Sequence, residues 1–549
     1  MEDSRAAKTP AFGERRNQMK RILTLVVLLF AAIGSSSYAA TTATWISGNG
    51  LYSAASNWDG GVVPKNSATE TFDIVIDNSA DVSLDDLTSI TINQLTLMSG
   101  NTFKVDGTGS VLNVLNTVSF DGTSVYASDG GVLDLSAATS HTGTDGYNLD
   151  RTLSAADAGS VLNLSSLTTL VRNSGGANDL HIKALAGGVV DLSGLSEFTD
   201  NGSGNGALHL SADGVDSKLD ISGVTQLTSA NIAALKGGEV TGQLINLTSS
   251  RVTKYGNTST LDLSQLVDGT DSTFIAEDGA IIDLHTANID RTSLIVQKGW
   301  QGAGGGLITT AVISYTGTDG FNLDRTLSAA DAGSVLDLSS LTTLTRNSGG
   351  SNDLTIKALA GGVVDLSGLS EFTDHASSNG ALHLSADGAG SKLDISGVTQ
   401  LKSANIAALK GGEVTGQLTD LTSSRVTKYG TTSTLDLSLL VDGTDSTFIA
   451  EDGAIIDLHT ANIDRTSLIV QKGWQGAGGG RITTAVTSYT GTDGFNLDRT
   501  LSAADAGSVL DLSSLTTLTR NSGGSNDLTI KALAGGVVDL SGLSEFTDH

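Results

Sequence analysis

The chain has 549 residues and no cysteine, so neither a disulfide framework nor a cysteine-based metal site can form. Its formal net charge of −28 argues against binding nucleic acid or an anionic membrane through a basic surface. With 67 glycines, 2 prolines and 4% aromatic residues, any core must consist of layers of small aliphatic side chains.

Residues 1–40 are predicted to be an N-terminal extension and an export signal. Met19, the expected initiator, opens a basic start that is followed by an apolar run of 13 residues, Ile22–Gly34. Ser37 and Ala39 supply the small residues of a cleavage site. This pattern predicts a secretory signal peptide, and the apolar run is too short for a transmembrane span. We therefore expect a bacterial protein that is secreted or displayed on the outer cell surface, with no transmembrane helix after cleavage.

Residues 41–77 differ in composition from the segments that follow. They contain two tryptophans and the one proline beyond the signal in the pattern W-x2-G-x-G-x7-W-x-G-G-x2-P. The first coil of a solenoid has no neighbour to cover it, so a bulky aromatic cap is expected there. The residues of the pattern are Trp45, Gly48, Gly50, Trp58, Gly60, Gly61 and Pro64.

The next segment introduces a phrase that returns along the rest of the chain, first seen in full at Gly130–Ser136 (GGVLDLS). Its period-2 alternation places Leu133 and Leu135 on an inward face and Asp134 on the outward face. The glycines before it supply the positive φ of a tight corner. Successive outward positions are separated by 20–29 residues: Asn93, Asn113, Asp134, Asn163, Asp191, Asp220, Thr241, Asp262 and Asp283. This spacing predicts an all-β fold, a right-handed parallel β-helix with an N-terminal Trp-rich cap.

The cap pattern followed by these coils resembles the N-terminal region of many secreted bacterial β-helix proteins, including autotransporter-type passengers and large surface adhesins. The resemblance covers the Trp…Asn-Trp…Gly-Gly…Pro segment, with Asn57 before Trp58, and the coil phrase. It implies a β-helical architecture and an exported protein, and it points to no single family.

A longer repeat is superimposed on the coils. The sequence GTDG(Y/F)NLDRTLSAADAGSVL begins at Gly143, Gly317 and Gly491, which are 174 residues apart. The two full units differ at 17 positions, and the leucines of the phrase do not change. We divide the chain into unduplicated coils at 78–141, full units at 142–315 and 316–489, and a partial unit at 490–549 that we expect to be truncated.

The outward aspartates are the first candidate binding feature. If the coils stack in register, each carboxylate lies about 5 Å from the next. Such a column is either a hydrated face that opposes lateral association or a set of sites bridged by Ca²⁺. The column comprises Asp134, Asn163, Asp191, Asp220, Asp262, Asp283, Asp337, Asp365, Asp394, Asp436, Asp457, Asp511 and Asp539. The speculative Ca²⁺ ligands among them are Asp191, Asp220, Asp262, Asp283, Asp365, Asp394, Asp436 and Asp457; no other cofactor is expected.

Other motifs favour structure over chemistry. Asp-Gly pairs such as Asp145-Gly146, Asp213-Gly214, Asp268-Gly269 and Asp278-Gly279 are good tight turns, and the nine-residue calcium repeat is absent. The glycine-rich run at Trp300–Gly306 is predicted to be a wide corner, since no Lys-Ser/Thr follows it as in a phosphate loop.

Catalysis is not expected. Asp85-Asp86 is the one Asp-Asp pair, and it has no histidine nearby in the sequence. The histidines His209, His383, His285 and His459 are predicted to be single outward strand residues without a second ligand at metal spacing.

These observations predict an exported structural or adhesive rod, a monomer that presents a repeated polar, acidic face. Its expected partner is an extended polymer such as a polysaccharide, or another surface protein, and not nucleic acid. Two alternatives stay open: a polysaccharide-acting β-helix enzyme, lyase or hydrolase, and a calcium-stiffened or ice-binding array.

Overall fold

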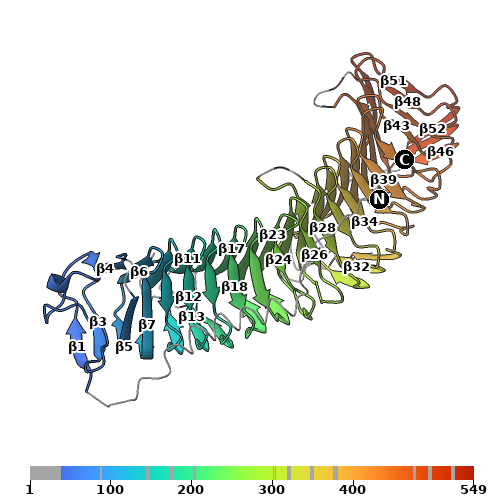
Figure 1. Cartoon of the computed structure of the whole chain (residues 1–549). Coiled ribbons are helices and arrows are strands. Elements are labelled where there is room, and N and C mark those ends of the chain that lie inside the picture. Colours follow the sequence, from blue (N-terminus) through green and yellow to red (C-terminus); the bar gives the residue numbers. More distant parts are fainter. Residues whose placement is uncertain are drawn as a thin grey trace, which may run out of the picture.

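The computed structural model describes residues 39–86, 89–143, 149–172, 178–201, 206–300, 302, 304–317, 323–346, 352–374, 381–473, 476, 478–491, 498–520 and 526–548. These residues form a long, curved rod of stacked coils (Figure 1). The predicted signal peptide and the pair Asp145-Gly146 lie outside the described residues. The described part of the chain has no helix with the length and hydropathy of a membrane span.

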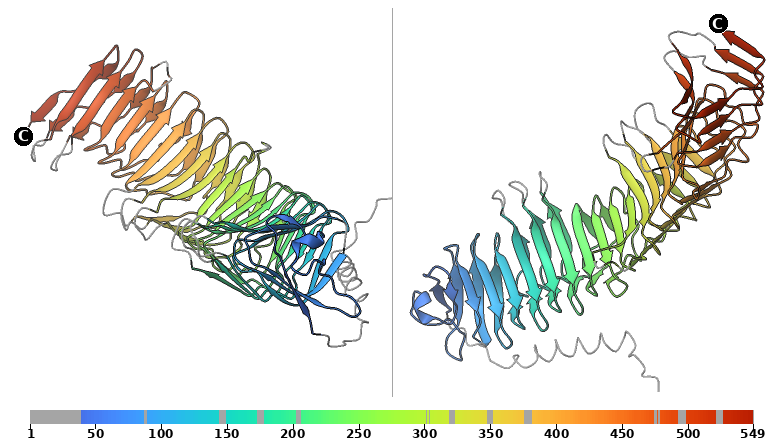
Figure 2. Two further views of the ribbon diagram at one scale, coloured as in Figure 1. Left: turned by 90° about the vertical axis from the view of Figure 1, so that its left-hand side faces the viewer. Right: turned by 90° about the horizontal axis from the view of Figure 1, so that it is seen from above.

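Each coil contributes one strand to a long sheet that runs the length of the rod (Figure 2). Its strands pair in parallel in the order β2 (Gly50–Leu51), β4 (Asp81–Leu84), β6 (Thr102–Asp106), β8 (Ser124–Ser128), β11 (Arg151–Ala156), β14 (Leu180–Leu185), β17 (Leu208–Asp213), β20 (Ala230–Leu235), β23 (Arg251–Tyr255), β25 (Thr273–Glu277), β27 (Ser293–Gln297), β30 (Arg325–Ala330), β33 (Leu354–Leu359), β36 (Leu382–Asp387), β38 (Ala404–Leu409), β40 (Arg425–Tyr429), β42 (Thr447–Glu451), β44 (Ser467–Gln471), β47 (Arg499–Ala504) and β50 (Leu528–Leu533).

A second sheet carries the LDLS strands and falls into three sections. The first section is β1 (Thr41–Thr44), β3 (Phe72–Ile76), β5 (Ser89–Leu97), β7 (Val111–Ser119), β9 (Val132–Asp134), β12 (Val161–Asn163), β15 (Val189–Asp191), β18 (Lys218–Ile221), β21 (Glu239–Gly242) and β24 (Thr260–Leu261). The second is β26 (Ile281–Asp283), β28 (Leu307–Thr309), β31 (Val335–Asp337), β34 (Val363–Asp365), β37 (Lys392–Ile395), β39 (Glu413–Gly416) and β41 (Thr434–Leu435). The third is β43 (Ile455–Asp457), β45 (Arg481–Thr483), β48 (Val509–Asp511) and β51 (Val537–Asp539).

The third side of the coil is made of short sheets, and one 3₁₀ turn, η1 (Ala55–Asn57), lies in the cap. The short sheets are β10 (Ser140–Thr142), β13 (Thr169–Arg172) and β16 (Glu197–Asp200); β19 (Gln226–Thr228) and β22 (Asn246–Thr248); β29 (Ser314–Thr316), β32 (Thr343–Arg346) and β35 (Glu371–Asp374); and β46 (Ser488–Thr490), β49 (Thr517–Arg520) and β52 (Glu545–Asp548). All strand pairs are parallel, so the predicted parallel β-helix is confirmed. Parallel crossover connections are almost always right-handed, and the right-handed sense stays a prediction.

The core is a stack of small aliphatic layers. Leu133, Leu162 and Val190 are fully buried and pair in register through β9, β12 and β15. Leu439 is 55% exposed at the position of Gln265, which is the outward position expected from that substitution. The alternation in the phrase therefore assigned inside and outside correctly.

One predicted coil position is wrong. Asn113 pairs with Thr91 and not with Asn93, because the register between β5 and β7 shifts between Ile92 and Gln94. A bulge inserts residues that a count along the sequence does not detect.

The two glycines of the phrase have different functions in the corner. Gly361 has a φ of +95°, which favours glycine. Gly362 has no such φ, but a Cβ there would lie 2.3 Å from the carbonyl oxygen of Ala329 in the previous coil. The first glycine makes the turn, and the second allows two coils to approach.

The aromatic cap covers the N-terminal end of the core, as predicted. Trp45 and Trp58 are each 1% exposed, and their rings meet edge to face with centroids 5.0 Å apart. Tyr52 packs against Trp58 at the same centroid distance, and its hydroxyl donates to the backbone oxygen of Pro64 at 2.7 Å. The tryptophans therefore protect the first aliphatic layer from water.

Successive units are joined by a repeated ion-pair cluster. Arg291 makes a bidentate pair with Asp271, at 3.0 and 2.9 Å, and Arg325 from the next unit reaches the same carboxylate at 3.2 Å. Arg465, Asp445 and Arg499 repeat this arrangement at the following junction. The guanidinium at the start of each of these two units thus contacts the unit before it.

Candidate functional site

The predicted acidic column exists, but its members have a structural role. At all thirteen predicted positions Oδ1 accepts the backbone N–H of the residue two places later, at 2.9–3.1 Å. This is an Asx turn, in which the side chain replaces a backbone acceptor at a corner. Each carboxylate therefore closes the corner between the second and third sides of its coil.

The column is also discontinuous. Asp191 pairs directly with Asp220, and Asp365 with Asp394, but Thr241 and Thr415 follow these pairs. The other speculative Ca²⁺ ligands, Asp262, Asp283, Asp436 and Asp457, flank the breaks in the second sheet between β24 and β26 and between β41 and β43.

Local donors further satisfy several of these carboxylates. Lys392 lies 3.3 Å from Asp394, and Arg481 lies 2.6 Å from Asp511. The backbone N–H and the hydroxyl of Ser264 hold the pKa of the Asp262 carboxyl below its usual value. Within the described residues, the column brings no three carboxylate or imidazole ligands to one point.

The glycine-rich run also binds part of the chain itself. The backbone N–H groups of Gly299 and Gly304 donate to Oδ1 of Asp278 at 2.8 and 3.2 Å, and that of Gly302 donates to Oδ2 at 3.2 Å. Burial would raise the pKa of Asp278, but these N–H groups and the hydroxyl of Tyr255 together lower it. The run is therefore a turn closed around an internal carboxylate.

The histidine prediction is wrong for His209. The neighbouring coil places His181 beside it, with stacked rings whose centroids are 4.6 Å apart, and Oδ2 of Asp179 lies 3.4 Å from Nε2 of His209. His383 has a carboxylate partner, Asp353, at 3.5 Å but no such second imidazole, because Thr355 stands at the equivalent of His181.

The remaining predicted sites are simple surface features. His285 and His459 lie beside Asp283 and Asp457 of their own corners, at 3.3 and 3.6 Å. The exposed pair Asp85-Asp86 lies in the corner after β4.

One outward residue from each strand of the long sheet forms a continuous row, which we call the outer ladder. Its members are polar: Asp81, Thr102, Ser124, Thr152, His181, His209, Asn231, Arg251, Thr273, Ser293, Thr326, Thr355, His383, Asn405, Arg425, Thr447, Ser467, Thr500 and Thr529. Unlike the second sheet, the long sheet is not interrupted among the described residues.

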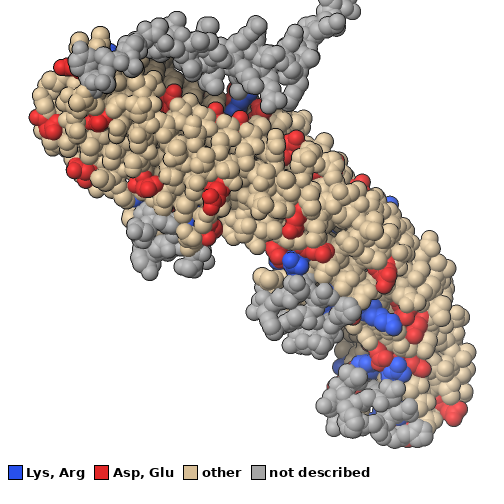
Figure 3. Space-filling view, turned by 90° about the horizontal axis from the view of Figure 1, so that it is seen from below, with Lys and Arg blue, Asp and Glu red and all other residues tan. Residues whose placement is uncertain are grey.

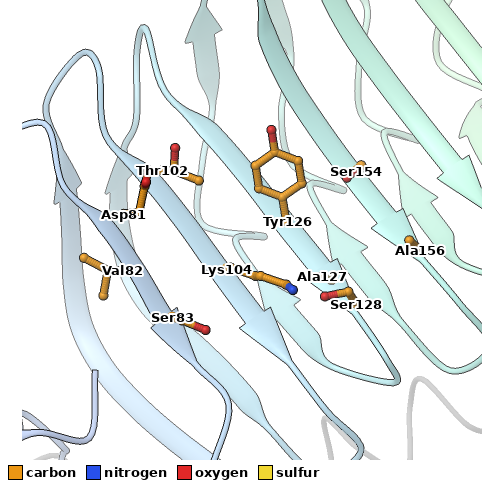
Figure 4. Close-up of a pocket in the computed structure, with 10 residues that line it drawn as sticks. All are labelled: Asp81, Val82, Ser83, Thr102, Lys104, Tyr126, Ala127, Ser128, Ser154 and Ala156. Carbon is orange, nitrogen blue, oxygen red and sulfur yellow. The ribbon is translucent and has the colours of Figure 1, made fainter. Parts of the chain in front are cut away.

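A shallow groove of about 400 Å³ lies on the outer face of β4, β6, β8 and β11. The ring of Tyr126 stands up from β8 between Thr102 and Ser154 (Figure 4). Asp81 is the carboxylate of its described lining, and Lys104 is the cation. On the face seen from below, acidic side chains are spread along the rod and do not gather into one patch (Figure 3).

The fold and these surfaces define a class, a capped parallel β-solenoid with polar outer rows. No family model, curated protein or solved structure matches the chain.

Proposed function

We propose that this protein is an exported structural or adhesive rod that binds an extended polysaccharide along the outer ladder of the long sheet. The continuity of this ladder through every described coil is the observation that carries the proposal. Neighbouring rungs lie about 4.8 Å apart and offer hydroxyl, amide, imidazole and guanidinium groups. A polymer with regularly spaced hydroxyl groups presents matching donors and acceptors.

Binding on such a surface is the sum of many weak contacts. Each rung offers only one or two hydrogen bonds in water, where the net contribution of a bond is about 0.5–1.5 kcal/mol. Repetition raises the overall affinity through multivalency, and each 174-residue unit adds further rungs. Tyr126 adds an aromatic ring on which an apolar face of a sugar can stack.

The groove supports binding over hydrolysis. A glycosidase needs two carboxyl groups about 5–10 Å apart, one of them a proton donor. The described lining of the groove presents Asp81 with Lys104. Asp81 is itself hydrogen-bonded to Asn49, at 3.0 Å.

The location and assembly state belong to the same proposal. The predicted signal peptide supports export to the cell surface or the medium, and the acidic surface supports a partner other than nucleic acid. We expect a monomeric rod whose length, and not its oligomeric state, sets the number of rungs.

Retention of the purified chain on insoluble cellulose, chitin and xylan tests this proposal. The equivalent rungs Thr273 and Thr447 would be replaced together by alanine, and a second variant would carry Tyr126→Ala. The control replaces Thr228 and Thr248, which lie on the third side of the coil. We expect retention on at least one polymer, reduced by the first two variants and unchanged in the control, with circular dichroism unaltered. No retention, or equal loss in the control, would contradict the proposal.

A further inference from the structure

Four metal-ligating side chains from three consecutive coils meet at one edge of the long sheet. Asp150 and Asp179 immediately precede β11 and β14, His181 lies on β14 and His209 on β17. Ligand atoms of Asp150, Asp179 and His181 all lie within 4.8 Å of one another. Oδ2 of Asp179 is 3.9 Å from Nε2 of His181 and 3.4 Å from Nε2 of His209.

The backbone orients the two carboxylates toward the imidazoles. Oδ1 of Asp150 accepts the N–H of Asp179 at 2.8 Å, and Oδ1 of Asp179 accepts the N–H of Ala207 at 2.8 Å. These bonds fix one oxygen of each carboxylate and leave the other available. Nδ1 of His209 is 3.4 Å from the side-chain amide of Asn231, the kind of outer contact that orients a metal-binding imidazole.

The charges also suit a cation. Two carboxylates in adjacent coils repel each other, and two stacked imidazoles oppose double protonation. Burial lowers the pKa of His181, and Lys183 and His209 lower it further, while Asp179 and Asp150 act in the opposite direction. The neutral imidazole that results is the form that coordinates a metal.

We propose that Asp150, Asp179, His181 and His209 bind one divalent transition-metal ion of the zinc class. Two imidazole nitrogens with two carboxylate oxygens are ligands that Zn²⁺ and Co²⁺ accept, whereas Ca²⁺ and Mg²⁺ prefer oxygen alone. Bonds of about 2.0–2.2 Å require the donor atoms to move closer together. Asp150 is exposed and His181 half-buried, so rotation of their side chains can bring their ligand atoms together. The ion would join three coils at this edge.

The tandem repeat supplies a matched control within the chain. In the next unit, Asp324 and Asp353 make the same backbone bonds, at 2.8 Å each, and His383 lies 3.5 Å from Asp353. Thr355 replaces the second imidazole on the same strand position. The second unit therefore has three of the four ligands, and we expect it to bind the metal much more weakly.

The test is equilibrium dialysis of the full chain, without a polyhistidine tag and after treatment with a chelator, against Zn²⁺ or Co²⁺. We expect one ion per chain, with the visible d–d absorption of nitrogen- and oxygen-bound Co²⁺. His181→Thr should abolish this stoichiometric binding, and Thr355→His should raise it to two ions per chain. His181→Thr should still fold, because Thr355 occupies the equivalent place in the second unit.

Two further variants keep the outcome unambiguous. Asp179→Asn should weaken binding by more than the about 10–100-fold that loss of an outer contact costs. His285→Ala removes an exposed histidine elsewhere on the rod and should change nothing. Absence of stoichiometric binding, or binding unaltered in folded His181→Thr, would overturn the proposal. Loss of polysaccharide retention with metal binding intact would overturn only the proposed function.

Discussion

Replacing Asp191 by alanine separates the two meanings of the acidic column. Its Oδ1 accepts the N–H of Ser193 at 2.9 Å, so alanine leaves that corner N–H without its acceptor. The loss of a capping side chain costs about 1–2 kcal/mol. Asparagine retains the acceptor, and Asn163 already does so one coil earlier, at 3.1 Å to the N–H of Ser165. We therefore expect Asp191→Ala to destabilise its coil and Asp191→Asn to be nearly neutral.

Hydrogen exchange measured by mass spectrometry reports this change locally, which matters because a solenoid need not unfold as one unit. A loss of about 1–2 kcal/mol should accelerate exchange in peptides covering β15 about 5–30-fold. Peptides from the aromatic cap should be unchanged. If asparagine and alanine were equally damaging, the negative charge and not the turn would be what the coil needs. If alanine had no effect, the Asx-turn interpretation would be wrong.

Three further outcomes follow from buried features. Gly362→Ala forces a Cβ to within 2.3 Å of a backbone oxygen and should lower the melting temperature by several degrees, whereas Gly60→Ala, with no atom within 4 Å, should not. Asp374→Ala removes the ion pair, at 2.8 Å, of the fully buried Arg346 and should cost about 3–5 kcal/mol in urea unfolding, more than Asp374→Asn. Burial lowers the pKa of His141 to about 3, so the unfolded chain binds the extra proton first and stability is lost as the pH falls below about 6.5. His141→Tyr should flatten that acid loss in melts recorded between pH 7 and pH 4, and an unchanged slope would count against it.

The architecture was predictable because its signal is local. Each corner and inward strand lies within a few residues of its phrase, and Leu133 and Leu162 reveal the buried face without knowledge of the neighbouring coil. The aromatic cap followed from the exposed end that any solenoid must cover. Asn93 was misplaced because a bulge changes the count between coils.

The contacts between coils were much harder to predict. His181 and His209 are 28 residues apart, and only the pairing of β14 with β17 places one ring on the other. Aligning LHIKAL with LHLSAD strand on strand would have found the pair. The outward position of Asp191 was visible in the alternation, but its bond to the backbone was not, because alternation gives the face of a residue and not its partner.

The repeat contains a whole number of coils, seven strands of the second sheet from β12 to β28 before β31 begins the next unit. A duplication of 174 residues therefore ends at the same corner at which it began. Recombination between units can change the length of the rod in steps without altering the phase of its faces. The arginine of each added unit, as Arg325 shows, finds its carboxylate already waiting in the unit before. Rod length in this protein can thus vary between lineages as a copy number, independently of selection on its core.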